Sequence, residues 1–83
     1  MRTEGPKRLA DWMKTRTLSQ RALAEMLGLS QQSVSQWLRR IARPDADQRE
    51  AIAALTDGAV PVSAWRTPRE AARLAALRPP AAA

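Results

Sequence analysis

Uncharged amide and hydroxyl side chains are concentrated in one short stretch, LGLSQQSVSQWLRR, which spans residues 27–40. They are interleaved with Val34, Trp37 and Leu38, whose spacing is typical of the buried face of a helix. The polar groups then fall on the opposite face. Such groups discriminate hydrogen-bond donors from acceptors on base edges, and glutamine can pair bidentately with adenine. The residues that this pattern indicates for base reading are Gln31, Gln32, Ser35 and Gln36.

Arginines lie on both sides of these amides. Arg39, Arg40 and Arg43 follow the stretch, and Arg21 precedes it. Their position predicts contacts with phosphate groups, which supply sequence-independent affinity for DNA. Two other interpretations remain open, because glutamine-rich helix faces are often plain solvated surface and arginines are often solvated or paired with neighbouring acids. Trp37 has the spacing of a core residue rather than of a platform for base stacking.

Composition excludes several kinds of protein chemistry. The 83 residues contain no cysteine, histidine or tyrosine, so the chain lacks the usual general base, zinc ligands and thiol nucleophile. We therefore expect neither an enzyme nor a cofactor or metal site. No apolar run is long enough to span a membrane and no signal peptide is evident. The chain is therefore expected to be soluble and intracellular.

The net charge of +6 indicates a polyanionic partner. Residues 1–43 carry nine Lys/Arg against three Asp/Glu, whereas residues 44–65 carry one against four. Residues 66–83 are basic again, with four against one. One side of the domain is therefore expected to face the polyanion. The arginines of the last segment either contact DNA or keep an alanine-rich tail in solution.

Apolar periodicity predicts an all-α bundle of four to five helices, with no strand. The predicted helices cover residues 6–15, 20–27, about 31–40, about 46–56 and 68–77, with a one-turn element near 60–65. Ile41 and Leu55 are expected to face inward at the ends of the third and fourth helices. Ser19, Ser30 and Thr67 are expected N-caps, and either Asp45 or Asp47 caps the fourth helix. The segment from Pro79 onward is expected to be disordered.

The second and third predicted helices are joined by only Gly28-Leu29-Ser30, so they must cross steeply. Ala24 provides the small residue at the crossing, and Gly28 tolerates the positive φ of the turn. Val34 and Trp37 can press back onto the preceding helix. This arrangement is a helix-turn-helix, whose second helix enters the major groove of DNA.

Residues 20–39 resemble the helix-turn-helix of the lambdoid phage repressor and Cro family. Alanine, glycine and bulky apolar residues stand at the matching positions Ala24, Gly28, Leu29, Val34 and Trp37, and the likeness extends over about residues 6–58. The Gln-Gln-Ser at the start of the third helix resembles the variant of the family that reads operators there, which adds Ser33 to the base-reading residues. Gln20 matches a position that commonly binds phosphate, and the helix N-terminus behind Ser19 favours an anion.

The sequence departs from the family after the third helix. Leu38-Arg39-Arg40-Ile41 replaces the common Glu-Asn-Gly-Lys-like exit, so the loop's phosphate contacts are not transferred and a longer helix is possible.

The resemblance implies a sequence-specific regulator of transcription, phage- or prophage-like, that represses by occupying a palindromic operator on double-stranded DNA as a homodimer. It also implies a location in the cytoplasm of a bacterial or phage-infected cell, in association with the nucleoid. Residues 1–65 form the predicted DNA-binding domain, and residues 66–83 form a basic helix and flexible tail. Val60, Val62 and Trp65 are the predicted dimer contacts. The alternative is a protein-interaction module, antitoxin-like or adaptor, that uses the same helices and the acidic segment around residues 45–57.

Overall fold

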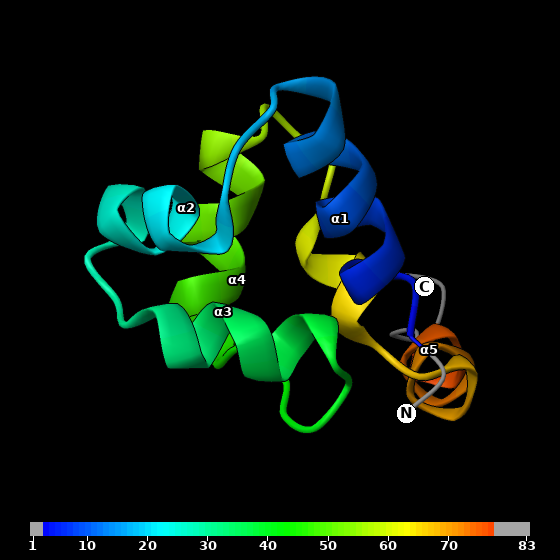
Figure 1. Ribbon diagram of the computed structural model, residues 1–83. Coiled ribbons are helices and arrows are strands. Elements are labelled where there is room, and N and C mark those ends of the chain that lie inside the picture. Colours follow the sequence, from blue (N-terminus) through cyan, green and yellow to red (C-terminus); the bar gives the residue numbers. More distant parts are fainter. Residues whose placement is uncertain (1–2, 78–83) are drawn as a thin grey trace.

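The computed structural model describes residues 3–77, which contain five α-helices, one 3-10 turn and no strand (Figure 1). The predicted all-α fold is confirmed. The elements in chain order are α1 (Gly5–Thr15), α2 (Gln20–Leu27), α3 (Gln31–Leu38), α4 (Ala46–Leu55), η1 (Val62–Trp65) and α5 (Pro68–Ala76).

Serine side chains begin the two central helices, as predicted. The Ser19 hydroxyl accepts from the Ala22 amide at 3.0 Å, and the Ser30 hydroxyl accepts from the Ser33 amide at 3.3 Å. Each bond satisfies a backbone donor that has no partner inside its own helix. The starting points of α2 and α3 are therefore set by local side-chain chemistry.

Helices α4 and α5 each begin with a reciprocal capping box. Asp45 accepts from the Gln48 amide at 2.8 Å, while the Gln48 side chain accepts from the Asp45 amide at 2.9 Å. The same exchange joins Thr67 and Glu70 at the start of α5. Of the two aspartates that the sequence left open for α4, Asp45 is the cap. A capping box satisfies two end-of-helix donors at once.

The turn between α2 and α3 has the predicted geometry. Gly28 has a φ of 69°, in the left-handed region that an L side chain rarely adopts. The Leu29 amide then donates to the Ala24 carbonyl at 2.9 Å, which closes the end of α2. Ala24 and Val34 are both buried. The small side chain and the glycine turn together allow α3 to cross close to α2.

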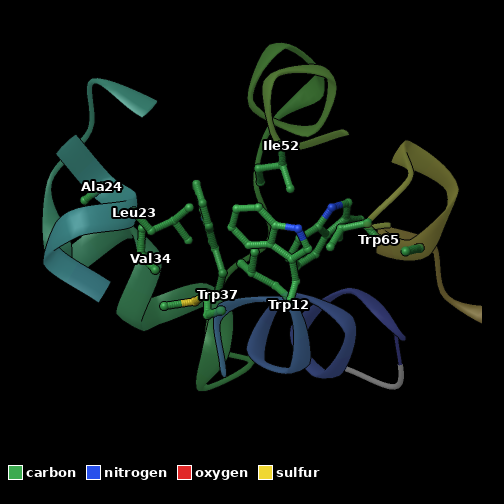
Figure 2. Close-up of a cluster of buried hydrophobic side chains, with 11 residues drawn as sticks. Trp12, Leu23, Ala24, Val34, Trp37, Ile52 and Trp65 are labelled. Carbon is green, nitrogen blue, oxygen red and sulfur yellow. The ribbon is translucent and has the colours of Figure 1, made fainter. Parts of the chain in front are cut away.

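All three tryptophans of the chain belong to one core between α1, α3 and η1 (Figure 2). The rings of Trp37 and Trp65 meet edge to face, with centroids 6.3 Å apart, and Trp12 packs in the same cluster. Edge-to-face contact aligns the positive ring edge with the negative ring face. Leu23, Val34 and Ile52 complete the cluster from α2, α3 and α4. The predicted core role of Trp37 is confirmed.

The end of α3 differs from the prediction. The helix stops at Leu38 rather than near residue 40, because Arg40 adopts a left-handed conformation with φ 60°. The Ile41 amide turns back to the Gln36 carbonyl at 2.9 Å, and the Arg40 amide to the Trp37 carbonyl at 3.1 Å. These are the two bonds of a Schellman motif, which usually has glycine at the left-handed position. The reversal directs Ile41 outward at 58% exposure, so its predicted burial is wrong.

The end of α4 also differs from the expected pattern. Leu55 is 36% exposed rather than directed inward, whereas the neighbouring Thr56 is buried. The Thr56 hydroxyl donates to the Ile52 carbonyl at 2.8 Å and accepts from the Val60 amide at 3.1 Å. A threonine therefore occupies the interior position at this end because it joins α4 to the segment that leads into η1.

Helix α5 contributes nothing to the core. None of its residues is buried, and in Figure 1 it lies at the edge of the molecule. The helix ends at Ala76, within one residue of its predicted end at 77. The predicted disordered tail from Pro79 onward lies outside the described residues. The division into two parts after residue 65 stays a prediction.

Candidate DNA-binding interface

Helix α3 is held to the protein by one face only. Val34 is fully buried and Trp37 is 3% exposed, and both project into the core shared with α1 and α2 (Figure 2). Gln32 and Gln36 follow each other one helical turn apart, on the face opposite Val34. The apolar anchors thus fix the helix so that its amide side chains lie on the other side.

The predicted base-reading residues differ in exposure. Gln31 and Gln32 are exposed, whereas Ser33, Ser35 and Gln36 are half-buried. The Ser33 hydroxyl lies 3.1 Å from the hydroxyl of the capping Ser30, which restrains its orientation. The N-terminal turn of α3 therefore presents the two glutamines most openly.

Helix α3 carries no charged residue. Its outward face can offer amide and hydroxyl donors and acceptors, but it cannot attract phosphate by itself. Electrostatic attraction to DNA must therefore come from residues outside α3.

The start of α2 contains the first group of predicted phosphate contacts. The Ser19 hydroxyl is used as the N-cap, and Gln20 next to it is half-buried. Arg21 pairs with Glu25 at 3.5 Å, and both side chains are more than two-thirds exposed. Exposed pairs of this kind contribute about 0.3–0.5 kcal/mol, so a phosphate can readily replace Glu25 as the partner of Arg21.

The three arginines after α3 lie in three different settings. Arg39 is exposed and makes no ion pair with any residue between 3 and 77. Arg40 donates to the Thr3 carbonyl at 2.7 Å and so ties the N-terminal segment to the end of α3. Arg43 donates to the Trp65 carbonyl at 3.2 Å and pairs with Glu70. Arg39 is the most available of the three for an external anion.

The predicted dimer contacts are placed mainly inside the protomer. Val60 and Trp65 are both fully buried, and only Val62 is partly exposed. Trp65 packs so closely on Gly5 that a β-carbon added to this glycine would lie 2.2 Å from the indole ring. In this conformation, Val62 is the one member of the group that a second copy can reach.

Sequence reasoning missed two long-range contacts at this end of the molecule, Arg40 with Thr3 and Arg43 with Glu70. They join residues 37 and 27 positions apart, and no local pattern indicates such pairs. The capping box identified Glu70 only as the partner of Thr67. The Thr67 amide and then the Arg43 guanidinium hold the pKa of Glu70 at about 2, well below its ordinary 4.5.

The described residues offer neither a metal site nor a membrane-spanning helix. Within residues 3–77, no group of three or more acidic, histidine or cysteine side chains is placed to hold a metal ion. No helix in the same range has the length and apolar character needed to cross a bilayer.

Comparison with known proteins agrees with this geometry. A family model described as helix-turn-helix matches residues 9–58, which is more than half of the chain and includes α2, the Gly28 turn and α3. Searches of curated proteins and of solved structures found no match. The chain therefore belongs to the helix-turn-helix family, of the Cro/C1 type, and is a DNA-binding regulator of transcription.

Proposed function

We propose that this protein is a repressor, phage- or prophage-like, that binds a palindromic operator as a homodimer and reads each half-site with α3. The observation that carries the proposal is the division of α3 into two faces. Val34 and Trp37 are buried on one side, while Gln31 and Gln32 are exposed at the N-terminal turn of the helix. This turn approaches base edges most closely when such a helix docks in the major groove.

Base reading is assigned to the uncharged residues of α3. Gln31 and Gln32 are the principal readers, because each can pair with adenine through both a donor and an acceptor. Ser33, Ser35 and Gln36 are the less exposed members of the group. We assign them hydrogen bonds to neighbouring base pairs once the helix lies in the groove.

Phosphate binding is assigned to residues on both sides of α3. The start of α2 supplies Ser19, Gln20 and Arg21, where unpaired backbone amides and the helix dipole favour an anion. Arg39 and Arg40 supply charge at the other end. Arg43 can join them only if phosphate competes with its contacts to Glu70 and the Trp65 carbonyl.

The dimer is proposed because a helix of eight residues reads only a few base pairs. Two copies on half-sites about one helical turn apart, roughly 34 Å, give useful specificity. Bound over a promoter, such a dimer would exclude RNA polymerase and repress transcription.

Selection of bound fragments from a random duplex pool tests these proposals together. The expected result is an enriched sequence with two inverted half-sites. A single unrepeated site among the winners would contradict the dimer while keeping base reading. No enrichment above the starting pool, at physiological salt, would contradict sequence-specific binding itself and favour the protein-interaction alternative.

A further inference from the structure

Helix α5 carries positive charge that no acidic side chain within residues 3–77 neutralises. Arg69 and Arg73 are exposed and Arg66 just before the helix is half-buried. None of the three forms an ion pair within the part of the chain that the structure describes. Glu70 is the one acid in residues 66–77, and Arg43 already occupies it. This segment therefore presents cations that have no acidic partner among the described residues.

The fold places the start of this helix beside the segment that follows α3. Arg43 lies five residues beyond the end of α3, and it contacts both the Trp65 carbonyl and Glu70. The same guanidinium thus joins the exit of α3 to η1 and to the first turn of α5. In Figure 1, α5 accordingly lies beyond the C-terminal end of α3, on the outer edge of the molecule.

Two local features stabilise the N-terminal turn of α5. Thr67 and Glu70 form a reciprocal capping box, and Pro68 fits the first helical turn because its missing amide has no partner there anyway. The capping box and the contact of Glu70 with Arg43 thus order the start of α5 without burying any of its side chains. Arg69 and Arg73 stay exposed to a partner outside the protein.

We propose that α5 is a second DNA-binding element, which contacts the sugar-phosphate backbone beside the bases read by α3. This inference rests on the proposed function, because it takes the duplex held by α3 as the polyanion. Arg69 and Arg73 make the contacts, and Arg66 adds charge at the junction. The helix reads no bases: it lengthens the footprint and raises affinity for any sequence.

Charge favours a duplex over a second copy of the chain as the occupant. Leu74 and Leu77 form a short apolar strip on α5, with exposures of 48% and 67%. Arg69 and Arg73, four residues apart in α5, lie along one flank of this strip. Antiparallel pairing of two such helices would bring this flank against the same flank of its partner and so juxtapose like charges. Two leucines are also too little apolar surface to hold a helix at a membrane.

The test compares the salt dependence of binding on two duplexes that contain the same selected half-site. One ends at the bases read by α3, and the other extends 10 base pairs further on each side. The variant carries Arg69→Gln and Arg73→Gln, which remove two charges and keep good helix formers. Lys14→Gln removes an exposed cation on α1 and serves as the control.

On the longer duplex, the variant should lose about two units of salt slope, because each phosphate contact contributes about 0.9. Between 50 and 200 mM salt, the affinity of the wild type should then fall about tenfold further than that of the variant. On the short duplex the two proteins should have the same slope. Lys14→Gln should match the wild type on both.

Equal slopes for variant and wild type on the longer duplex would overturn the proposal for α5. If the wild type still bound these duplexes more tightly than duplexes with a scrambled half-site, the proposed function would stand and only the role of α5 would fall. Sedimentation with vesicles of phosphatidylcholine and phosphatidylserine addresses a lipid target: binding that depends on Arg69 and Arg73, with an unchanged DNA slope, would assign α5 to a membrane surface instead.

Discussion

The contact between Gly5 and Trp65 allows a quantitative test of how the core closes. An alanine β-carbon at position 5 would lie 2.2, 2.4 and 2.6 Å from three atoms of the Trp65 ring, closer than any real contact of this kind. Trp65 is fully buried and cannot move aside without displacing Trp37, its edge-to-face neighbour. Overpacking of this type costs about 1–3 kcal/mol. Alanine recovers less than about 1 kcal/mol of helix propensity at this terminal position.

We therefore expect Gly5→Ala to lower the free energy of unfolding by about 2 kcal/mol. In a domain of this size, this corresponds to a fall in melting temperature of about 8–16 °C. Thermal and urea unfolding, followed by far-ultraviolet circular dichroism, measure both quantities. The slope of the urea transition should stay unchanged if the variant remains two-state.

Gly28→Ala provides a matched control for this measurement. A β-carbon there meets no atom within 4 Å, but the φ of 69° strains any L side chain. Its loss should be about 1 kcal/mol, from backbone conformation alone. A Gly5→Ala protein as stable as the wild type, or no less stable than Gly28→Ala, would refute the inferred closeness of α1 and η1.

Three further outcomes concern DNA binding and pH. Gln32→Ala should lose about 1–3 kcal/mol of discrimination at one base pair per half-site, with non-specific affinity nearly unchanged. Competition assays against single-base operator variants measure this discrimination. A parallel fall in specific and non-specific affinity would contradict base reading by Gln32. Arg39→Ala should weaken binding to every sequence and reduce the salt slope by about one unit per bound protomer in titrations at several salt concentrations, so an unchanged slope would remove Arg39 from the phosphate contacts. Because the folded protein lowers the pKa of Glu70 to about 2, this group stabilises the fold above pH 4.5, and its contribution should disappear as the pH falls from 4.5 toward 2. Glu70→Gln keeps a residue that can form the capping box. The unfolding free energy of this variant should vary less with pH over this interval than that of the wild type. Identical pH profiles of the two proteins would show that Glu70 is not held in its charged form.

Local chemistry accounts for most of what the sequence predicted correctly. Ser19, Ser30 and Thr67 begin helices because each satisfies an amide three residues ahead, which requires no information from the rest of the chain. Gly28 could be recognised in the same way, since a short connection between two crossing helices needs a positive φ. Repetition at helical spacing likewise identified Val34 and Trp37 as core residues.

The errors have a common physical origin. Ile41 and Leu55 continued the apolar spacing of their helices, but spacing does not reveal where a helix stops. Arg40 ends α3 in a left-handed conformation that glycine usually adopts, so an arginine at this position does not indicate a turn. At the end of α4, the hydrogen bonds of Thr56 to Ile52 and Val60 determine which side chain enters the interior.

The candidate site was predictable as a surface but not as a set of contacts. The amide face of α3 follows from its buried stripe, and this part needed only periodicity. The partners of Arg40 and Arg43 depend on how the N-terminal segment and α5 fold back beside α3, which is tertiary information. The same information places Val60 and Trp65 in the core, where spacing alone could not distinguish an interior anchor from a surface one.

The burial of all three tryptophans affects how the protein can be observed. The chain contains no tyrosine or phenylalanine, and the most accessible indole, Trp12, is only 8% exposed. Intrinsic fluorescence therefore originates entirely from the interior, and none of it from the face that carries the glutamines. Emission should stay constant while the protein saturates with DNA, and it should shift to the red only when the chain unfolds. A spectral change during a DNA titration would thus be a sign that binding rearranges the packing between the helices.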